Sequence, residues 1–214
     1  MSLPSDHAPL AERVEELLAA EGPLPIVAAG HPVLRRPAEP YEGQLSPALL
    51  ARFVEALRVT MHAAPGVGLA APQVGVPLRI AVVEDPATVP EEVAAARGRA
   101  PLPFRVLVNP AYDAAGPQLA AFYEGCLSVP GYQAVVARAA RVWLTGQDER
   151  GRALDEEVSG WPARIVQHET DHLNGTLYLD RAELRSLSTN EAVAALWAQP
   201  APGTAAKVLG FELP

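Results

Sequence analysis

Residues 168–172 read H-E-x-x-H, and this pattern constrains the fold more than any other part of the chain. On an α-helix, residues four apart lie on one face, so both histidines can bind a single metal ion. Glu169 follows the first histidine and can reach a water molecule at the open coordination position. The pattern therefore predicts a metal-binding helix, which we expect to begin after Gly160 and to end at Asn174-Gly175, a typical C-cap.

Two histidines leave a third protein ligand to be found, and known uses of this motif supply three candidates. A metzincin would place another histidine at position 178, where this chain has tyrosine, so that arrangement is excluded. A thermolysin-like site would use a glutamate about 20 residues downstream, close to Glu191. A thiolate from Cys126, with two histidines and one water, would also complete an open tetrahedral site. The residues alone leave Glu191 and Cys126 as alternatives.

Composition excludes several classes of protein. Cys126 is the only cysteine among 214 residues, so no intramolecular disulfide can form. The formal charge is −8, from 17 basic and 25 acidic side chains, which disfavours binding to nucleic acid. Acidic residues interrupt the N-terminus where a signal peptide would be apolar, and no run approaches the length of a membrane span. We therefore expect a cytoplasmic protein without membrane or sequence-specific nucleic-acid partners.

The rest of the chain predicts helices around a group of antiparallel strands. Apolar residues at helical spacing predict helices over 8–20, from Ser46 to Met61, and over 182–198. Strand-like runs occupy residues 78–83, 105–109, 119–123, 134–137, 141–147 and 153–158, and a turn signal predicts that the last two form a hairpin. Strands and helices do not alternate regularly. The fold class is therefore α+β, with antiparallel sheets packed around a central metal-binding helix and with flanking N- and C-terminal helices.

Proline, glycine and alanine mark the boundaries along the chain. Residues 86–103 interrupt the strands and are expected to be a surface insertion, and residues 199–214 are expected to be a loose tail. A chain of 214 residues suits one catalytic domain. We expect an N-terminal helical extension over 1–24, a single catalytic domain over 25–198 and a C-terminal tail over 199–214.

Residues 66–73 form a glycine-rich segment, G-V-G-L-A-A-P-Q. It is not a dinucleotide-binding loop, because it follows a predicted helix instead of a strand and meets Pro72 at once. Its glycines would expose backbone groups to an extended ligand, and Gln73 offers a side-chain amide N–H to an oxygen. Taken alone, the segment is more typical of a plain turn.

Three segments together resemble the motifs of the peptide deformylase family. Those motifs read G-Φ-G-L-A-A-x-Q, E-G-C-L-S and Q-H-E-x-D-H-L-x-G, where Φ is apolar. Every fixed position matches, at residues 66–73, 124–128 and 167–175. Further similarity at residues 31–35, 107–110 and 131–132 extends the resemblance over residues 25–182.

The resemblance implies removal of the formyl group from the N-terminal formyl-methionine of nascent bacterial polypeptides. One divalent metal ion, with water as its fourth ligand, would be held by Cys126, His168 and His172. Iron(II) is the expected ion, with zinc, nickel or cobalt as replacements. A metal-bound hydroxide would attack the formyl carbon, and Glu169 would be the general base that passes the proton to the departing amine.

The resemblance also implies how the substrate is held. The oxyanion of the tetrahedral intermediate would lie between the metal, the Gln73 side-chain amide and the backbone N–H of Leu127. The peptide would run as an added strand along Val67, Gly68 and Gly125, with its methionine side chain in an apolar pocket.

Two features of the chain, one residue and one segment, depart from the family pattern. Gln133 stands where many members have arginine, so one polar contact to the substrate backbone is not carried over. Some members dock on the ribosome through a basic C-terminal helix, whereas residues 181–198 mix Arg181 and Arg185 with Glu183 and Glu191. Only transient association with the ribosome is therefore expected.

Two other functions compete with deformylation at this stage. One is a zinc metallopeptidase that uses Glu191 as its third ligand. The other is a non-catalytic relative that binds peptides. The intact ligands, Gln73 and Glu169 argue against loss of catalysis.

Overall fold

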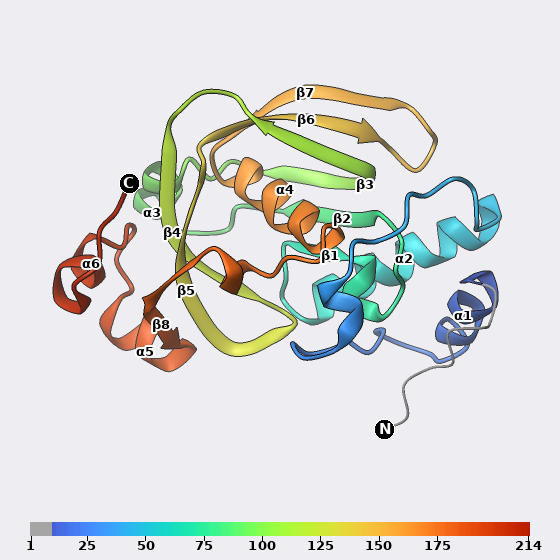
Figure 1. Cartoon of the computed structure of the whole chain (residues 1–214), viewed down its shortest axis with the longest axis horizontal. Coiled ribbons are helices and arrows are strands. Elements are labelled where there is room, and N and C mark those ends of the chain that lie inside the picture. The colour runs from blue at the N-terminus through green and yellow to red at the C-terminus, as the bar shows by residue number, and fades with distance from the viewer. Residues whose placement is uncertain (1–9) are drawn as a thin grey trace.

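Two antiparallel sheets enclose a central helix in the computed structural model, which describes residues 10–214 (Figure 1). The larger sheet has the strand order β1-β2-β3-β6-β7, and the smaller has the order β4-β5-β8. Helix α4, Gly160–Leu173, packs against strands of both sheets. The α+β class expected from the sequence is confirmed.

The remaining elements follow in chain order. The strands are β1 Gly68–Ala70, β2 Ile80–Asp85, β3 Leu102–Ala114, β4 Leu119–Cys126, β5 Val129–Ala139, β6 Arg141–Gln147, β7 Ala153–Ser159 and β8 Ala182–Thr189. The helices are α1 Leu10–Leu17, α2 Pro47–Ala63, α3 Glu91–Arg97, α5 Asn190–Leu196 and α6 Gly203–Leu209, with short 3₁₀ helices η1 Pro32–Arg35, η2 Ala71–Val74 and η3 Tyr178–Asp180. Within residues 10–214, no helix is long and apolar enough to cross a bilayer.

Helix α2 covers the larger sheet and forms as its sequence predicts. The side chain of Ser46 accepts a hydrogen bond from the N–H of Leu49 at 3.2 Å, which caps the helix. One stripe of α2 is buried against the sheet: Leu49, Leu50, Phe53, Val54, Leu57 and Met61. Helix α1 packs on α2 through Val14, and it is shorter than the predicted helix over 8–20, whose first two residues lie outside the described part of the chain.

The start of α4 is fixed by a close approach to the segment after α3. Gly160 has φ +65°, and a Cβ at this position would lie 2.3 Å from the carbonyl oxygen of Gly98. The same carbonyl accepts a hydrogen bond from the N–H of Trp161 at 3.1 Å. Glycine is therefore required where α4 begins. The helix ends before Asn174 and Gly175, as the sequence predicts.

The C-terminal part differs from its prediction. Residues 182–198, expected to be one helix, form strand β8 and then the short helix α5. The residues of β8 include good helix formers, but the open edge of β5 pairs with them, from Tyr132↔Thr189 to Val136↔Ala182. Tertiary pairing therefore overrides local propensity here.

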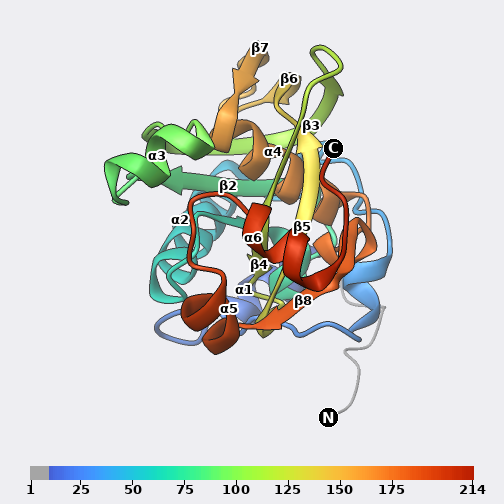
Figure 2. The same ribbon diagram turned by 90° about the vertical axis from the view of Figure 1, so that its left-hand side faces the viewer.

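The two segments expected to be irregular also contain helices. Residues 86–103 include α3, which has no buried residue of its own. Arg97, the last residue of α3, and Arg99 nevertheless line a cavity of the molecule. Residues 199–214 include α6, whose Ala205 and Ala206 pack with Phe211 against Tyr123 and Val135 of the smaller sheet. Figure 2 shows α5 and α6 gathered on the side of the molecule formed by β5 and β8.

Candidate metal centre and substrate cavity

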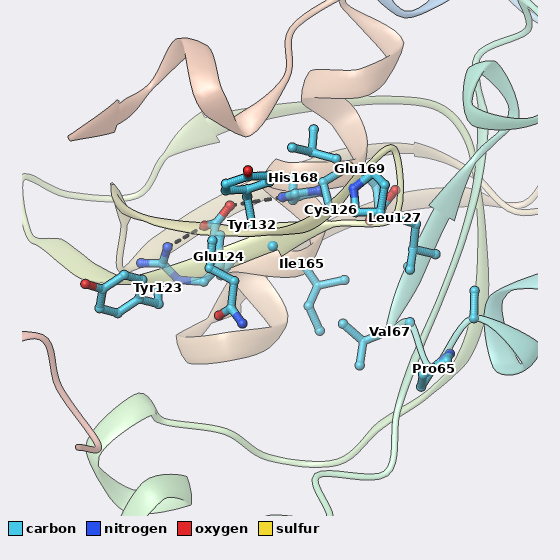
Figure 3. A pocket seen from close by; sticks show the side chains of 18 of the residues that line it. Pro65, Val67, Tyr123, Glu124, Cys126, Leu127, Tyr132, Ile165, His168 and Glu169 are labelled. Atoms are coloured by element: carbon cyan, nitrogen blue, oxygen red, sulfur yellow. Dashed lines mark hydrogen bonds and ion pairs between the residues drawn. The ribbon is translucent and has the colours of Figure 1, made fainter. Parts of the chain in front are cut away.

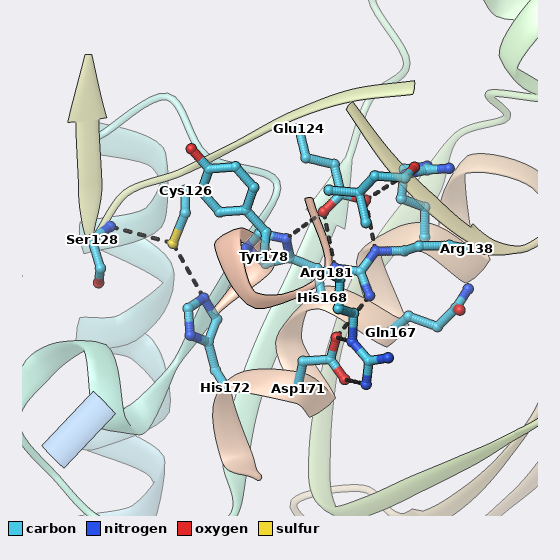
Figure 4. Close-up of polar contacts among 12 residues, drawn as sticks. Glu124, Cys126, Ser128, Arg138, Gln167, His168, Asp171, His172, Tyr178 and Arg181 are labelled. Atoms are coloured by element: carbon cyan, nitrogen blue, oxygen red, sulfur yellow. Dashed lines mark hydrogen bonds and ion pairs between the residues drawn. The ribbon is translucent and has the colours of Figure 1, made fainter. Parts of the chain in front are cut away.

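Three candidate ligands from two elements meet at one point inside the molecule (Figure 4). Cys126 is the last residue of β4, and His168 and His172 lie one turn apart on α4. Their ligating atoms all lie within 4.8 Å of one another, and Sγ of Cys126 is 3.3 Å from Nε2 of His172. Glu191 is exposed at the start of α5 and is not part of this cluster, so the metallopeptidase alternative is not favoured.

The residues of this cluster fit a divalent metal ion. In a tetrahedral site with ordinary bond lengths, a thiolate sulfur and an imidazole nitrogen are about 3.5 Å apart, close to the separation between Cys126 and His172. Burial holds the pKa of His172 well below its usual value. The imidazole of His172 is therefore neutral, which is the form that binds metals.

The ring of His168 is oriented from two sides. Its Nδ1 lies 3.0 Å from Oε2 of Glu124, which leaves Nε2 for a metal. The ring of Tyr178 stacks on it, with centroids 6.2 Å apart and an interplanar angle of 20°. A carboxylate behind a ligating histidine fixes its tautomer and strengthens it as a ligand.

Glu124 is itself held in a buried ion network. Arg138 donates to it from Nε at 2.6 Å and from Nη2 at 2.9 Å, and Arg164 donates from Nη1. Burial opposes ionisation of Glu124, but the charge of Arg138 and the hydrogen bond to His168 hold its pKa well below the usual range. The carboxylate therefore stays ionised behind His168.

Asp171, one turn along α4 from His168, continues this network. It accepts a hydrogen bond from Arg138 at 2.8 Å, two from Arg181 at 2.8 and 3.0 Å, and one from the hydroxyl of Tyr112 at 2.9 Å. These partners lie on β5, next to η3 and on β3. The network thus ties the histidine-bearing helix to both sheets (Figure 4).

Glu169 lies beside the ligands and against the backbone of β1. It is 4% exposed, and a Cβ at position 68 would lie only 2.2 Å from its Oε1, so only glycine leaves room for this carboxylate. Burial raises the pKa of Glu169 to about 7. A carboxylate with such a pKa can both take up and release a proton near neutral pH.

Gln73 is fixed so that its amide nitrogen faces the sulfur of Cys126. Its Oε1 accepts a hydrogen bond from the N–H of Ala70 at 2.9 Å, which determines which end of the amide points inward. Its Nε2 lies 3.3 Å from Oγ of Ser128 and 3.6 Å from Sγ of Cys126. The amide N–H groups are therefore turned toward the metal centre.

A cavity of about 630 Å³ opens beside these residues. Val67 and Gly68 border it just before and at the start of the edge strand β1, and Gly125 and Leu127 border it near the end of β4. In Figure 3, Val67 lies across the cavity from Glu124, and Ile165 of α4 lies between them. The predicted catalytic, metal-binding and substrate-binding residues are thus brought together around one space of a size that holds a short peptide.

Sequence reasoning assigned no role to the charged residues behind the ligands. Glu124 and Asp171 could have been found, because each is a charged residue within two positions of a ligand in a matched motif. Arg138 gave no such signal, since it lies among apolar residues of β5 and far from any motif.

The site combines a cysteine sulfur, two imidazoles, a carboxylate of raised pKa and inward-facing amide donors beside a peptide-sized cavity. These features define the class of a metal-dependent hydrolase. Comparison with known proteins specifies the class further. The polypeptide deformylase family matches residues 23–187. The chain belongs to this family, as its three motifs indicated, and it is a deformylase.

Individual deformylases are similar to this protein over most of its length. Peptide deformylase 1 of Streptomyces coelicolor is 75% identical over 214 residues, which cover 100% of this chain and 98% of the relative. Peptide deformylase 3 of Streptomyces avermitilis is 78% identical over 210 residues, covering 98% and 94%. A crystal structure of the class I type b peptide deformylase of Acinetobacter baumannii with Met-Ala-Ser bound is 34% identical, with a TM-score of 0.67. The match covers 76% of this chain and 99% of the Acinetobacter baumannii chain.

Proposed function

We propose that the chain removes the formyl group from the N-terminal formyl-methionine of nascent polypeptides, and that Cys126, His168 and His172 hold the metal for this reaction. The observation that carries the proposal is the meeting of these three side chains beside the buried carboxylate of Glu169. The polypeptides are made in the cytoplasm, and we place the enzyme there, in transient contact with the ribosome.

The metal is one divalent ion, and we propose iron(II), with zinc, nickel or cobalt able to replace it. One thiolate and two neutral imidazoles suit all four ions. When bound, the ion lowers the pKa of a coordinated water toward about 7 and polarises the formyl oxygen.

Glu169 is the general base in this proposal. Its carboxylate takes the proton of the attacking water and later delivers it to the amine that leaves. The buried position against Gly68 excludes bulk water from the carboxylate, and the pKa raised to about 7 suits both transfers.

Gln73 and Leu127 stabilise the charge that develops on the formyl oxygen. The hydrogen bond from Ala70 holds the Gln73 amide so that Nε2 donates toward the metal centre. The backbone N–H of Leu127 follows Cys126 directly and supplies the second donor. One such donor is typically worth about 3–4 kcal/mol in the transition state.

The peptide lies between two strand edges. Strand β1 ends the larger sheet and β4 ends the smaller, so Val67 and Gly68 on one side and Gly125 on the other have backbone groups that can pair with an added strand. The Acinetobacter baumannii relative with Met-Ala-Ser bound supports a peptide that begins with methionine. We place the methionine side chain against Ile165 and Val67.

The test is formate release from formyl-Met-Ala-Ser by protein purified without oxygen, with its metal content measured. We expect turnover by the wild type, loss of metal and activity in Cys126→Ala, and retained metal with activity reduced by about 10²–10⁴-fold in Glu169→Gln. Full activity in Cys126→Ala would contradict the ligand assignment. Binding of the formyl-peptide without any turnover would instead show a non-catalytic relative.

A further inference from the structure

Arg97 is a cation at the cavity wall that no carboxylate neutralises within residues 10–214. It ends helix α3, in the segment expected from the sequence to be a surface insertion, and it lines the cavity of about 630 Å³. Its Nε donates to the carbonyl oxygen of Pro200 at 3.1 Å, and its guanidinium lies 5.2 Å from the ring centroid of Trp161. These contacts hold the guanidinium in place, while Nη1 and Nη2 have no acceptor in the described part of the chain.

The other cavity arginines are already paired. Arg99 donates to the buried carboxylate of Asp85 at 2.8 and 2.9 Å. Arg164 donates to Glu124, whose two oxygens are fully engaged by arginines and His168. Among residues 10–214, Arg97 is thus the unpaired cation at the wall of the cavity, in a chain whose net charge is −8.

The surroundings of Arg97 favour an anion. Burial and repulsion from Arg99 lower the pKa of Arg97, as expected for a cation held without a counter-charge. The face of its guanidinium is used by Trp161, but stacking leaves the N–H edge free. That edge matches the two oxygens of a carboxylate, and such charge-assisted pairs are about twice as strong as neutral hydrogen bonds.

We propose that Arg97 is a specificity-determining residue that selects formyl-peptides carrying a carboxylate shortly after the formyl-methionine. The proposal rests on the deformylase function above. A cavity of about 630 Å³ holds more than a methionine side chain, so the second and third residues of the substrate also come under the influence of its wall. The carboxylate can belong to an aspartate or glutamate side chain or to the C-terminus of a short peptide.

The experiment compares kcat/KM for matched peptide pairs. Formyl-Met-Ala-Asp and formyl-Met-Ala-Asn, both as C-terminal amides, test a side-chain carboxylate at the third position, and formyl-Met-Asp-Ser and formyl-Met-Asn-Ser amides test the second. Formyl-Met-Ala-Ser as free acid and as amide tests the terminal carboxylate. We expect the wild type to prefer the carboxylate in at least one pair by about tenfold.

Variants assign the preference to Arg97. In Arg97→Gln the ratio for that pair should fall to about one, and in Arg97→Lys, which keeps the charge but not the fork, it should be intermediate. Arg150→Gln removes the same charge from the exposed turn between β6 and β7 and should keep the wild-type ratio.

Two results would overturn the proposal while leaving deformylation intact. One is that the wild type has equal kcat/KM for both peptides of every pair. This result is obtained with the wild type alone and does not depend on whether a variant folds. The other is a carboxylate preference that Arg97→Gln and Arg97→Lys leave unchanged. Absence of formate release from every peptide would overturn the deformylase function, and this proposal with it.

Discussion

The position of the Glu169 carboxylate depends on the absence of a side chain at Gly68. Glu169 is on α4 between His168 and His172, two of the proposed metal ligands, so its backbone cannot move without displacing them. The space taken up by its carboxylate is the space that a side chain on Gly68 would fill, with distances of 2.2 Å to Oε1 and 2.6 Å to Cδ. A glycine that looked like part of a turn is thus required for the position of this carboxylate, the proposed general base.

Gly68→Ala should therefore impair catalysis more than folding. The methyl group must push the carboxylate away from the attacking water, and misplacing a catalytic group by about 1 Å can cost 10²-fold in rate. We expect kcat/KM on formyl-Met-Ala-Ser to fall by about 10²-fold, with metal content preserved. Gly203→Ala, whose added methyl would meet no atom within 4 Å, is the matched control. Wild-type turnover in Gly68→Ala would show that Glu169 has room to spare.

The residues that meet at the proposed metal centre could be predicted from the sequence, but those behind them could not. Cys126, His168 and His172 lie in short motifs whose spacing has a chemical reason. The partnership of Glu124 with Arg138 and Arg164 depends on which residues of β4, β5 and α4 face one another, and no local pattern records this.

At the scale of elements, β8 shows how a neighbouring strand can decide secondary structure. Ser186 of β8 is 0% exposed, and its Oγ accepts a hydrogen bond from the N–H of Val135 on β5 at 2.7 Å. The same hydroxyl donates to the carbonyl of Glu183 at 2.6 Å. This one side chain satisfies a strand N–H at the point where the register between β5 and β8 shifts.

Ser186→Ala should weaken the attachment of β8. The change leaves the buried N–H of Val135 without an acceptor, which costs about 1–3 kcal/mol of unfolding free energy. Chemical denaturation of the metal-loaded enzyme measures this, with Leu184→Ala as the control on the same strand. Leu184 is 66% exposed, so its loss should change stability by less than about 0.5 kcal/mol. Equal stability of Ser186→Ala and the wild type would contradict this account of β8.

At the scale of the whole molecule, the residues of the proposed metal centre come from both of its layers. Cys126 belongs to the smaller sheet, whereas the histidines are on α4, which packs mainly on the larger sheet. An ion held by Cys126, His168 and His172 would link β4 to α4, next to the link made by Arg138 between Glu124 and Asp171. Metal binding should therefore stabilise the fold as well as supply chemistry.

Removal of the metal by a chelator should lower the melting temperature. An ion present at about 1,000 times its Kd adds about 4 kcal/mol to the free energy of unfolding. Calorimetry with and without chelator checks this. The chelator should lower the melting temperature of Glu169→Gln as it does for the wild type. It should change the melting temperature of Cys126→Ala only a little. An identical melting temperature for loaded and stripped wild type would show that the two layers do not depend on the ion.

The sequence by itself determined the α+β class and the family and predicted which residues meet at the centre, because ligand spacing on a helix and short motifs are local properties of the chain. Tertiary structure decided the rest. The strand at residues 182–189, the helix at 203–209, the buried ion network and the position of Arg97 on the cavity wall all depend on contacts between residues far apart in sequence. Such contacts are set by how sheets and helices pack, and packing is a property of the whole chain.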